Sequence, residues 1–300
     1  VACFTSVFFF QGPATPRIYP FPLPDALPIW HLAADEAELL RVVRPSAGGV
    51  ELELFPDGAA EELVDGLLPD LAEQVVQSQV ATLMDLGVVV DHPAPGVYEV
   101  ASGDVDWLFV PLEAAAKMRA SFILLGPLLS RFGRVIMSNP GGDRIGRRPV
   151  NLHVDAMRTL GAEIEYRNGY YFAKAPGRLR GGEVTFPFVS VMGTENAMLA
   201  ATLADGRTTI RPAAREPEVD DLIAFLQKMG AAVERVAPDT IVVDGRRRLR
   251  GAEHNVIPDR IEAGTFVVAT AVAGGDVTLQ CEPREPPGAV LETAAAIGAH

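Results

Sequence analysis

Three stretches of the chain carry the same short pattern: LMDLGVVV at residues 83–90, MRTLGAEI at 157–164 and LQKMGAAV at 226–233. In each stretch a glycine closes a run with helical apolar spacing, and a short apolar run follows. A glycine after the last helical turn supplies the left-handed conformation that residues with a β-carbon resist. The pattern therefore predicts a helix, a turn and a strand at all three places.

The aligned glycines recur at nearly constant spacing. Their separations are 74, 69 and 68 residues, for the series Gly87, Gly161, Gly230 and Gly298. A second marker is an Ala- or Leu-rich helix that runs into a glycine and then a β-branched strand. Its separations are 73 and 69 residues, for the series Gly133, Gly206 and Gly275. Two markers with one period predict repeated units of about 70 residues that alternate helices and strands, and hence an α/β fold.

Composition excludes several classes of protein. The 26 Lys and Arg residues against 39 Asp and Glu give a net charge of −13, which disfavours a general nucleic-acid binder. Two cysteines cannot build a disulfide framework or a zinc site, which favours a reducing compartment. No uncharged apolar run reaches the roughly 18 residues of a membrane-spanning helix. We therefore expect a soluble, cytoplasmic protein without a membrane partner.

Residues 1–30 differ from the rest of the chain. They hold six of the 24 prolines, and residues 1–11 contain no Lys or Arg that could open a secretory signal. Residues 17–29 (RIYPFPLPDALPI) also resemble a translated sequencing adapter. We expect residues 1–30 to be non-native or disordered, a first domain over residues 31–214 and a partial second domain over 215–300, with the boundary near Ala213–Arg215.

The most informative segment for chemistry is SNPGGDRIGRRPVNLH, residues 138–153. The Asn-Pro-Gly-Gly run places Asp143 on a loop, next to Arg144, Arg147 and Arg148. A carboxylate among guanidinium groups predicts a pocket for a phosphate-bearing ligand together with one proton-transfer group. The alternative is a turn aspartate that pairs with surface arginines, an interaction of about 0–1 kcal/mol.

In this segment and five others the chain resembles the UDP-N-acetylglucosamine enolpyruvyltransferases. The other segments are MRAS (118–121), GPL (126–128), SVMGTEN (190–196), AAREPEV (213–219) and PDRIEAGTF (258–266). The resemblance covers roughly Leu68 to Leu279. It implies two inside-out α/β barrel domains, each built from three repeated units, of which the second is truncated in this chain.

The resemblance also implies an activity. These enzymes transfer the enolpyruvyl group of phosphoenolpyruvate to the 3-hydroxyl of UDP-N-acetylglucosamine and release phosphate, the first committed step of peptidoglycan synthesis. The two small molecules are thus the expected partners, and neither an organic cofactor nor a metal is expected. The same resemblance connects the chain with cell-wall biogenesis, cell shape and cell division.

Site residues follow from the resemblance by position. Asp143 aligns with the family's proton donor, which is cysteine in most members, and its pKa must be raised by burial for it to donate near neutral pH. Arg148 aligns with the arginine that meets the phosphoenolpyruvate phosphate, and Arg119 with an arginine on the sugar nucleotide. The remaining binding residues are expected on the uracil and ribose side, at Pro149, Val150, Asn151 and Leu152, and on the diphosphate loop, at Phe188, Val189, Ser190 and Val191.

The chain also departs from the family. Asn151 replaces a commoner aspartate, Phe188 replaces a lysine of some members, and none of the three lysines matches the family's Lys-Asn clamp on phosphoenolpyruvate. The family's carboxylate that deprotonates the sugar hydroxyl aligns beyond His300, so we expect a fragment with negligible turnover. Two alternatives stay open: a 3-phosphoshikimate 1-carboxyvinyltransferase, and a non-catalytic sugar-nucleotide binder. His153 is expected to be a structural hydrogen-bonding residue. The alternative interpretation of the segment at Ser190 is a structural turn before the helix that contains Glu195.

Overall fold

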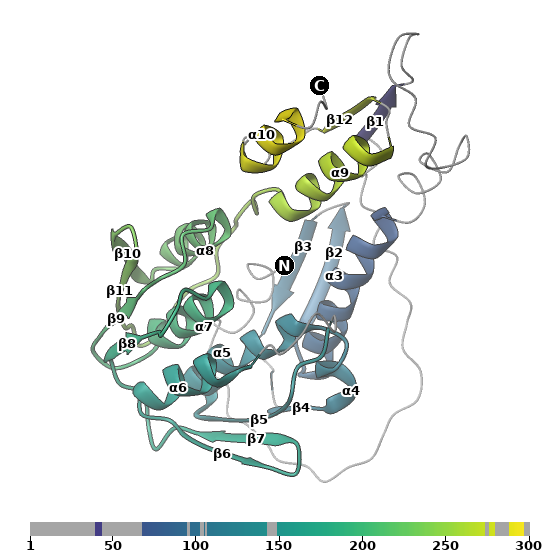
Figure 1. Cartoon of the computed structure of the whole chain (residues 1–300). Helices are drawn as coiled ribbons and strands as arrows, with labels where there is room; N and C mark the ends of the chain where they lie inside the picture. The colour runs from purple at the N-terminus through teal and green to yellow at the C-terminus, as the bar shows by residue number, and fades with distance from the viewer. Residues whose placement is uncertain are drawn as a thin grey trace, which may run out of the picture. The chain divides into compact units, whose positions relative to one another are not determined.

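The computed structural model describes residues 40–43, 68–94, 97–102, 105, 107–142, 149–273, 276–279 and 288–296 of the 300-residue chain. Packing divides the chain into two compact units (Figure 1). The described part of the first unit comprises Val75–Pro93 and Tyr98–Val256, and the second unit holds the other described residues.

The first unit contains two four-stranded sheets. One has the strand order β4-β5-β7-β6, with bounds Phe109–Val110, Arg134–Ser138, Tyr170–Lys174 and Glu163–Arg167. The other has the order β8-β9-β11-β10, with bounds Glu183–Thr185, Arg207–Arg211, Thr240–Asp244 and Ala232–Ala237. In both sheets the first two strands are parallel and the later pairs are antiparallel. The two sheets thus share one topology.

Helices connect the strands in the same way in both sheets. The parallel pair is bridged by α4 (Leu112–Ala115), η4 (Arg119–Leu124) and α5 (Leu125–Phe132) in one sheet, and by α7 (Val191–Thr202) in the other. The hairpin is reached through α6 (Asn151–Thr159) or α8 (Pro217–Lys228). Alternating strands and helices confirm the α/β class. The described strands form separate open sheets, and the barrel stays a prediction.

The repeated glycine turns have one geometry. Gly87, Gly161 and Gly230 have φ of 89°, 90° and 91°. Each glycine N–H donates to the carbonyl three residues earlier, and the following N–H donates to the carbonyl five residues earlier, at 2.9–3.1 Å. This is the Schellman ending of a helix, which requires a left-handed residue at the glycine position. Gly298 lies outside the described residues.

Helix α7 is the centre of the first unit. All its residues from Gly193 to Thr202 are buried, and α5, α6 and α8 pack around it (Figure 1). Gly126 lets α5 approach α7 closely, because a β-carbon at this position would overlap Asn196 of α7. The first unit continues beyond the expected boundary at residues 214–215, because β10 and β11 extend the sheet of β8 and β9. That domain boundary stays a prediction.

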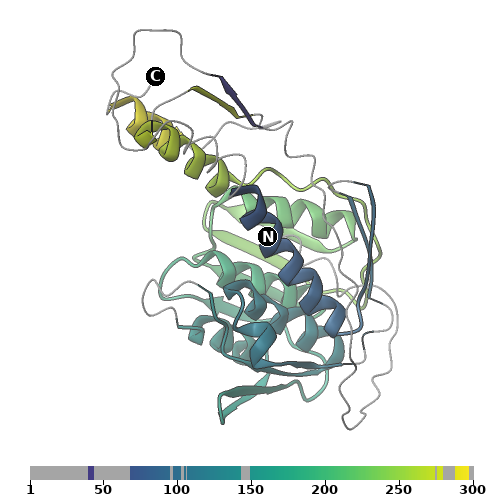
Figure 2. The same cartoon turned by 90° about the vertical axis from the view of Figure 1, so that its right-hand side faces the viewer.

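The remaining elements precede β4 or follow β11 in the chain. Helix α3 (Leu68–Asp85), dark blue in Figure 2, leads through the Gly87 turn into the paired strands β2 (Val89–Ala94) and β3 (Val97–Ala101). In the second unit β1 (Leu40–Val43) pairs antiparallel with β12 (Asp276–Leu279), and α9 (Arg260–Ala273) packs on α10 (Gly288–Ala296). None of the described helices is both long and apolar enough to cross a membrane.

Candidate functional site

A cavity of about 500 Å³ lies in the first unit. Its wall is assembled from the start of η4, the chain on both sides of residues 143–148, one face of α6, and β7. The lining residues are Arg119, Asn139, Pro140, Pro149, Val150, Asn151, Val154, Asp155, Arg158 and Tyr171. The volume falls within the roughly 300–1,000 Å³ that small-molecule sites occupy in proteins.

Helix α6 supplies one wall of the cavity. Its lining residues, Asn151, Val154, Asp155 and Arg158, follow an i, i+3, i+4, i+7 spacing, so they share one face of the helix. The Arg158 guanidinium lies 3.4 Å from the Asp155 carboxylate and donates to the Ile164 carbonyl at 2.9 Å. Arg158 is therefore held in place while half of its side chain stays exposed.

Arg119 connects the two flanks of the segment that carries Asp143. Its guanidinium Nη2 donates to the Pro149 carbonyl at 3.1 Å. On the other flank, a β-carbon placed on Gly142, whose φ is 92°, would lie 3.1 Å from the Arg119 backbone nitrogen. The Gly141 N–H also donates to the Ala115 carbonyl at 2.9 Å. Both ends of the segment are therefore anchored beside Arg119.

The structure brings four of the expected binding residues together. Arg119, Pro149, Val150 and Asn151 all line the cavity. Leu152 is buried in α6, and Phe188 and Val189 are exposed before α7; none of the three lines the cavity. Asp143, Arg148 and the neighbouring Arg144 and Arg147 lie outside the described residues.

Ser190 and Val191 begin helix α7. The Ser190 hydroxyl accepts a hydrogen bond from the Gly193 N–H at 3.2 Å, which satisfies one free amide of the first turn. The Thr194 hydroxyl donates to the Ser190 carbonyl at 2.8 Å and accepts from the Ala214 N–H at 3.0 Å. In this structure Ser190 acts as a helix cap, which is the structural alternative stated for this turn.

His153 of α6 belongs to a buried hydrogen-bond network. Burial, and secondly the charge of Arg119, lower its pKa to about 4, so the imidazole is neutral near pH 7. The Asn196 amide nitrogen lies 2.9 Å from His153 Nδ1 and donates to the Phe122 carbonyl at 3.0 Å. The Asn196 oxygen accepts from the Gly126 N–H at 2.7 Å. His153 thus accepts at Nδ1 and ties α6 to α5 and α7, consistent with a structural role.

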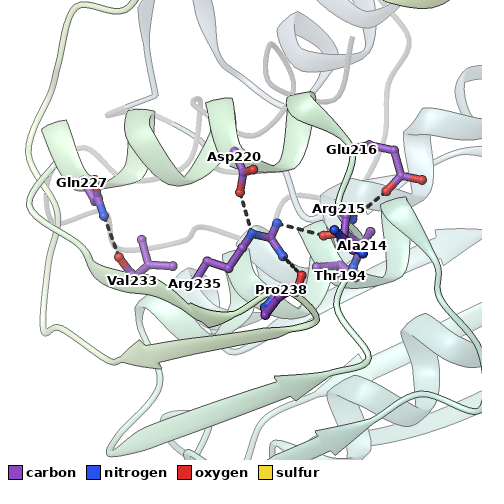
Figure 3. A network of polar contacts seen from close by, with 9 residues as sticks. All are labelled: Thr194, Ala214, Arg215, Glu216, Asp220, Gln227, Val233, Arg235 and Pro238. Atoms are coloured by element: carbon purple, nitrogen blue, oxygen red, sulfur yellow. Dashed lines mark hydrogen bonds and ion pairs between the residues drawn. The ribbon is translucent and has the colours of Figure 1, made fainter. Parts of the chain in front are cut away.

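The AAREPEV segment is held by a second polar network (Figure 3). From β10, the Arg235 guanidinium donates to Asp220 at 2.8 Å, to the Ala214 carbonyl at 2.8 Å and to the Pro238 carbonyl at 3.1 Å. The Arg215 N–H donates to the Glu216 carboxylate at 2.8 Å. These contacts fix the connection between β9 and α8, and they give this motif a structural role.

Sequence reasoning missed the rest of the cavity lining. The side chains it did not select are Asn139, Pro140, Val154, Asp155, Arg158 and Tyr171. The helical spacing from Asn151 could have indicated the α6 residues. No motif indicated Tyr171. Burial, and secondly Tyr166, raise the pKa of Tyr171 above its usual value, and the charge of Arg119 offsets part of this increase.

The polar and aromatic groups of the cavity are two guanidinium groups, two amides, one carboxylate and one aromatic ring, from Arg119, Arg158, Asn139, Asn151, Asp155 and Tyr171. Such a set suits an anionic ligand that also carries a planar polar group. Among the described residues, no group of three or more His, Cys, Asp or Glu side chains is arranged to hold a metal ion.

Comparison with known sequences finds a matching family model and several relatives of this chain. The family model of EPSP synthase (3-phosphoshikimate 1-carboxyvinyltransferase) matches residues 71–300. A UDP-N-acetylglucosamine 1-carboxyvinyltransferase of Aeromonas hydrophila is 46% identical over 222 residues, covering 71% of this chain and 53% of the relative. The one of Acinetobacter guillouiae is 48% identical over 218 residues, covering 72% and 51%. That of Gluconobacter oxydans is 40% identical over 265 residues, covering 85% and 63%.

Solved structures support the same fold. The enolpyruvyl transferase NikO from Streptomyces tendae aligns with a TM-score of 0.55 at 21% identity, over 64% of this chain and 45% of that chain. EPSP synthase from Acinetobacter baumannii aligns with a TM-score of 0.52 at 19% identity, over 65% and 44%. The chain spans about half the length of several of the curated relatives it matches. Because the family model covers residues 71–300, the chain belongs to the EPSP synthase family of enolpyruvyl transferases.

Proposed function

We propose that this chain takes part in the transfer of the enolpyruvyl group from phosphoenolpyruvate to the 3-hydroxyl of UDP-N-acetylglucosamine. The observation that carries the proposal is the convergence of Arg119, Pro149, Val150 and Asn151 on one cavity. Arg119 lies 30 positions before Pro149, on the other side of Asp143 in the chain, and all four residues were expected on the sugar nucleotide. The names of the curated relatives support the same substrate.

The proposed reaction proceeds by addition and elimination. The 3-hydroxyl oxygen adds to C2 of phosphoenolpyruvate, C3 takes a proton, and the hydroxyl proton leaves to a base. Loss of a proton from C3 and of phosphate from C2 then restores the double bond and yields the enol ether. Asp143 is the proposed proton donor to C3, and Arg148 the proposed partner of the phosphate.

The described residues would position the sugar nucleotide. The Arg119 and Arg158 guanidinium groups can each donate to diphosphate oxygens in the planar geometry that suits phosphate. The Asn151 amide carries both a donor and an acceptor, as the imide edge of uracil does. Because Arg119 also contacts both flanks of residues 143–148, ligand binding at Arg119 would act on the segment that holds the proposed proton donor.

The finer architecture belongs to the same proposal. The two four-stranded sheets would be two repeated units of an inside-out α/β barrel, supported by their shared strand order and by strands β5 and β9, which begin 73 residues apart. Such a barrel domain would include β10 and β11, and would therefore extend past the end of the expected first domain over residues 31–214. A place in cytoplasmic peptidoglycan synthesis follows from the proposed substrate.

Titration calorimetry of the 300-residue chain tests the substrate. UDP-N-acetylglucosamine should bind and shikimate 3-phosphate should not, and Arg119→Ala should weaken the sugar nucleotide at least tenfold (about 1.4 kcal/mol). Arg134→Ala, an exposed arginine outside the cavity, is the matched control and should bind as the unmodified chain does. Binding of shikimate 3-phosphate without binding of the sugar nucleotide would overturn the proposal in favour of the sister reaction.

A further inference from the structure

Tyr171 is the aromatic side chain among the described residues that line the cavity. It lies on β7, where it pairs in register with Met137 of β5 and Tyr166 of β6. No sequence motif of the chain indicated a role for this residue. Its ring shares the cavity with Asn151 of α6 and with Arg119.

The Tyr171 ring is braced by its neighbours. The Phe122 ring meets it edge-on at 5.4 Å with an interplanar angle of 75°, and the Tyr166 ring lies 4.7 Å away at 44°. The Tyr166 hydroxyl in turn accepts a hydrogen bond from the Asn139 amide at 2.7 Å. A ring fixed in this way loses little conformational freedom when a ligand binds, so it can serve as a preformed platform.

The groups around this ring point to a nucleobase. An aromatic face is suited to stacking on a planar heterocycle, while the Asn151 amide can pair with its polar edge. Arg119 and Arg158 supply cationic groups for an attached diphosphate. A sugar phosphate without a base would leave the Tyr171 ring unused.

We propose that Tyr171 is a specificity-determining residue that stacks on the uracil ring of the sugar nucleotide. The inference rests on the proposed function, because it assumes that a uridine diphosphate sugar enters this cavity. It adds a discriminating contact that no sequence motif of the chain indicated.

The test compares ligands with and without the base on the 300-residue chain. The ligands are UDP-N-acetylglucosamine, UDP and N-acetylglucosamine 1-phosphate. Their binding is measured by calorimetry, and by NMR titration where a ligand binds too weakly for calorimetry. The variants are Tyr171→Leu, which removes the ring, and Tyr171→Phe, which keeps the ring and removes the hydroxyl. Tyr170→Leu is the matched control, because successive strand residues face opposite sides and the Tyr170 ring packs 5.5 Å from Phe109.

Tyr171→Leu should weaken UDP and UDP-N-acetylglucosamine by about tenfold or more, the range of a lost base–aromatic stack, and leave N-acetylglucosamine 1-phosphate unchanged. Tyr171→Phe and Tyr170→Leu should bind all three ligands as the unmodified chain does. Equal weakening of the base-free ligand, or no weakening of UDP, would overturn the assignment while leaving the proposed function intact. Failure of the unmodified chain to bind UDP-N-acetylglucosamine would overturn the proposed function and the role of Tyr171 together.

Discussion

The Arg119 guanidinium donates a 3.1 Å hydrogen bond to the main-chain carbonyl of Pro149, a residue 30 positions further along the chain. The Arg119 backbone lies against Gly142 as well. One residue therefore lines the cavity and contacts both flanks of the segment that contains Asp143 and Arg148, one flank through its side chain and the other through its backbone. This arrangement joins ligand recognition to the placement of the proposed proton donor.

Arg119→Lys tests whether the shape of the guanidinium group matters beyond its charge. A lysine ammonium keeps the positive charge but cannot offer parallel donors to both a carbonyl and a diphosphate. We expect UDP-N-acetylglucosamine binding to weaken at least tenfold, with unchanged circular dichroism. The measurement is calorimetry beside Arg134→Lys as control. Equal affinity of Arg119→Lys and the unmodified chain would show that charge alone suffices.

Gly141→Ala tests the close contact at the start of the same segment. A β-carbon on Gly141 would overlap the Ala116 carbonyl, a backbone atom that cannot swing away. We expect a loss of about 1–3 kcal/mol in the free energy of unfolding, measured by denaturant titration, together with weaker sugar-nucleotide binding. Gly288→Ala is the control, because nothing lies within 4 Å of its added methyl group. Equal effects of the two variants would contradict this account.

The elements that could be predicted from the sequence are those fixed by local interactions. The helix-ending turns at Gly87, Gly161 and Gly230 depend on hydrogen bonds that reach back at most five residues. A short pattern therefore contains all the information that the turn needs, and its recurrence indicated the α/β class. The Ser190 cap is local in the same sense, since it binds an amide three residues later.

The cavity could be predicted only in part, because its contacts are long-range. That Tyr171 lines the cavity depends on the register of β7 with β5 and β6, which no local pattern specifies. Asn196 binds Gly126 and His153, which are 70 and 43 residues away. A single sequence contains no direct record of such pairs, so the expected site rested on motifs and omitted the residues between them.

Asp143→Cys tests the chemistry assigned to position 143. The neighbouring Arg144, Arg147 and Arg148 would stabilise a thiolate, which lowers the pKa of a cysteine there and makes it reactive. With UDP-N-acetylglucosamine present, the variant should gain one covalent adduct at residue 143 from a thiol-alkylating epoxide, located by peptide mass spectrometry. The unmodified chain and Asp143→Asn should show no adduct in that peptide. A mass shift there in the unmodified chain would refute the assignment.

His153 makes stability depend on pH on the acidic side. Its folded pKa of about 4 lies below the reference of 6.5, so below pH 6.5 the unfolded chain binds a proton that the folded chain excludes. Stability is therefore lost as pH falls from about 6.5 towards 4, by roughly 2 kcal/mol at pH 5. Denaturant titrations at pH 7 and 5 should show that acidification changes the free energy of unfolding of His153→Asn more favourably than that of the unmodified chain, by roughly 2 kcal/mol, although the variant is less stable at pH 7. An equal change in both proteins would exclude His153 as the source.

Glu195 affects stability with the opposite sign. Its side chain is fully buried, and neither carboxylate oxygen has a hydrogen-bond partner among the described residues. Burial, with the nearby charges of Glu218 and Glu216, raises its pKa from 4.5 to about 8. Between these values the folded chain holds a proton that the unfolded chain has released, so stability falls as pH rises from about 4.5 to 8.

Glu195→Gln removes this titration while keeping the shape of the side chain. The free energy of unfolding of Glu195→Gln minus that of the unmodified chain should therefore increase from pH 5 to pH 8. The increase should be about 1.4 kcal/mol per pH unit, and up to several kcal/mol in total. Glu163→Gln, on the exposed face of β6, is the control and should give parallel curves. Because His153 and Glu195 act with opposite signs, the double variant with His153→Asn should show the flattest pH profile. Parallel curves for Glu195→Gln and the unmodified chain would mean that this carboxyl group is already ionised in the folded protein at pH 5, with a partner that compensates its burial.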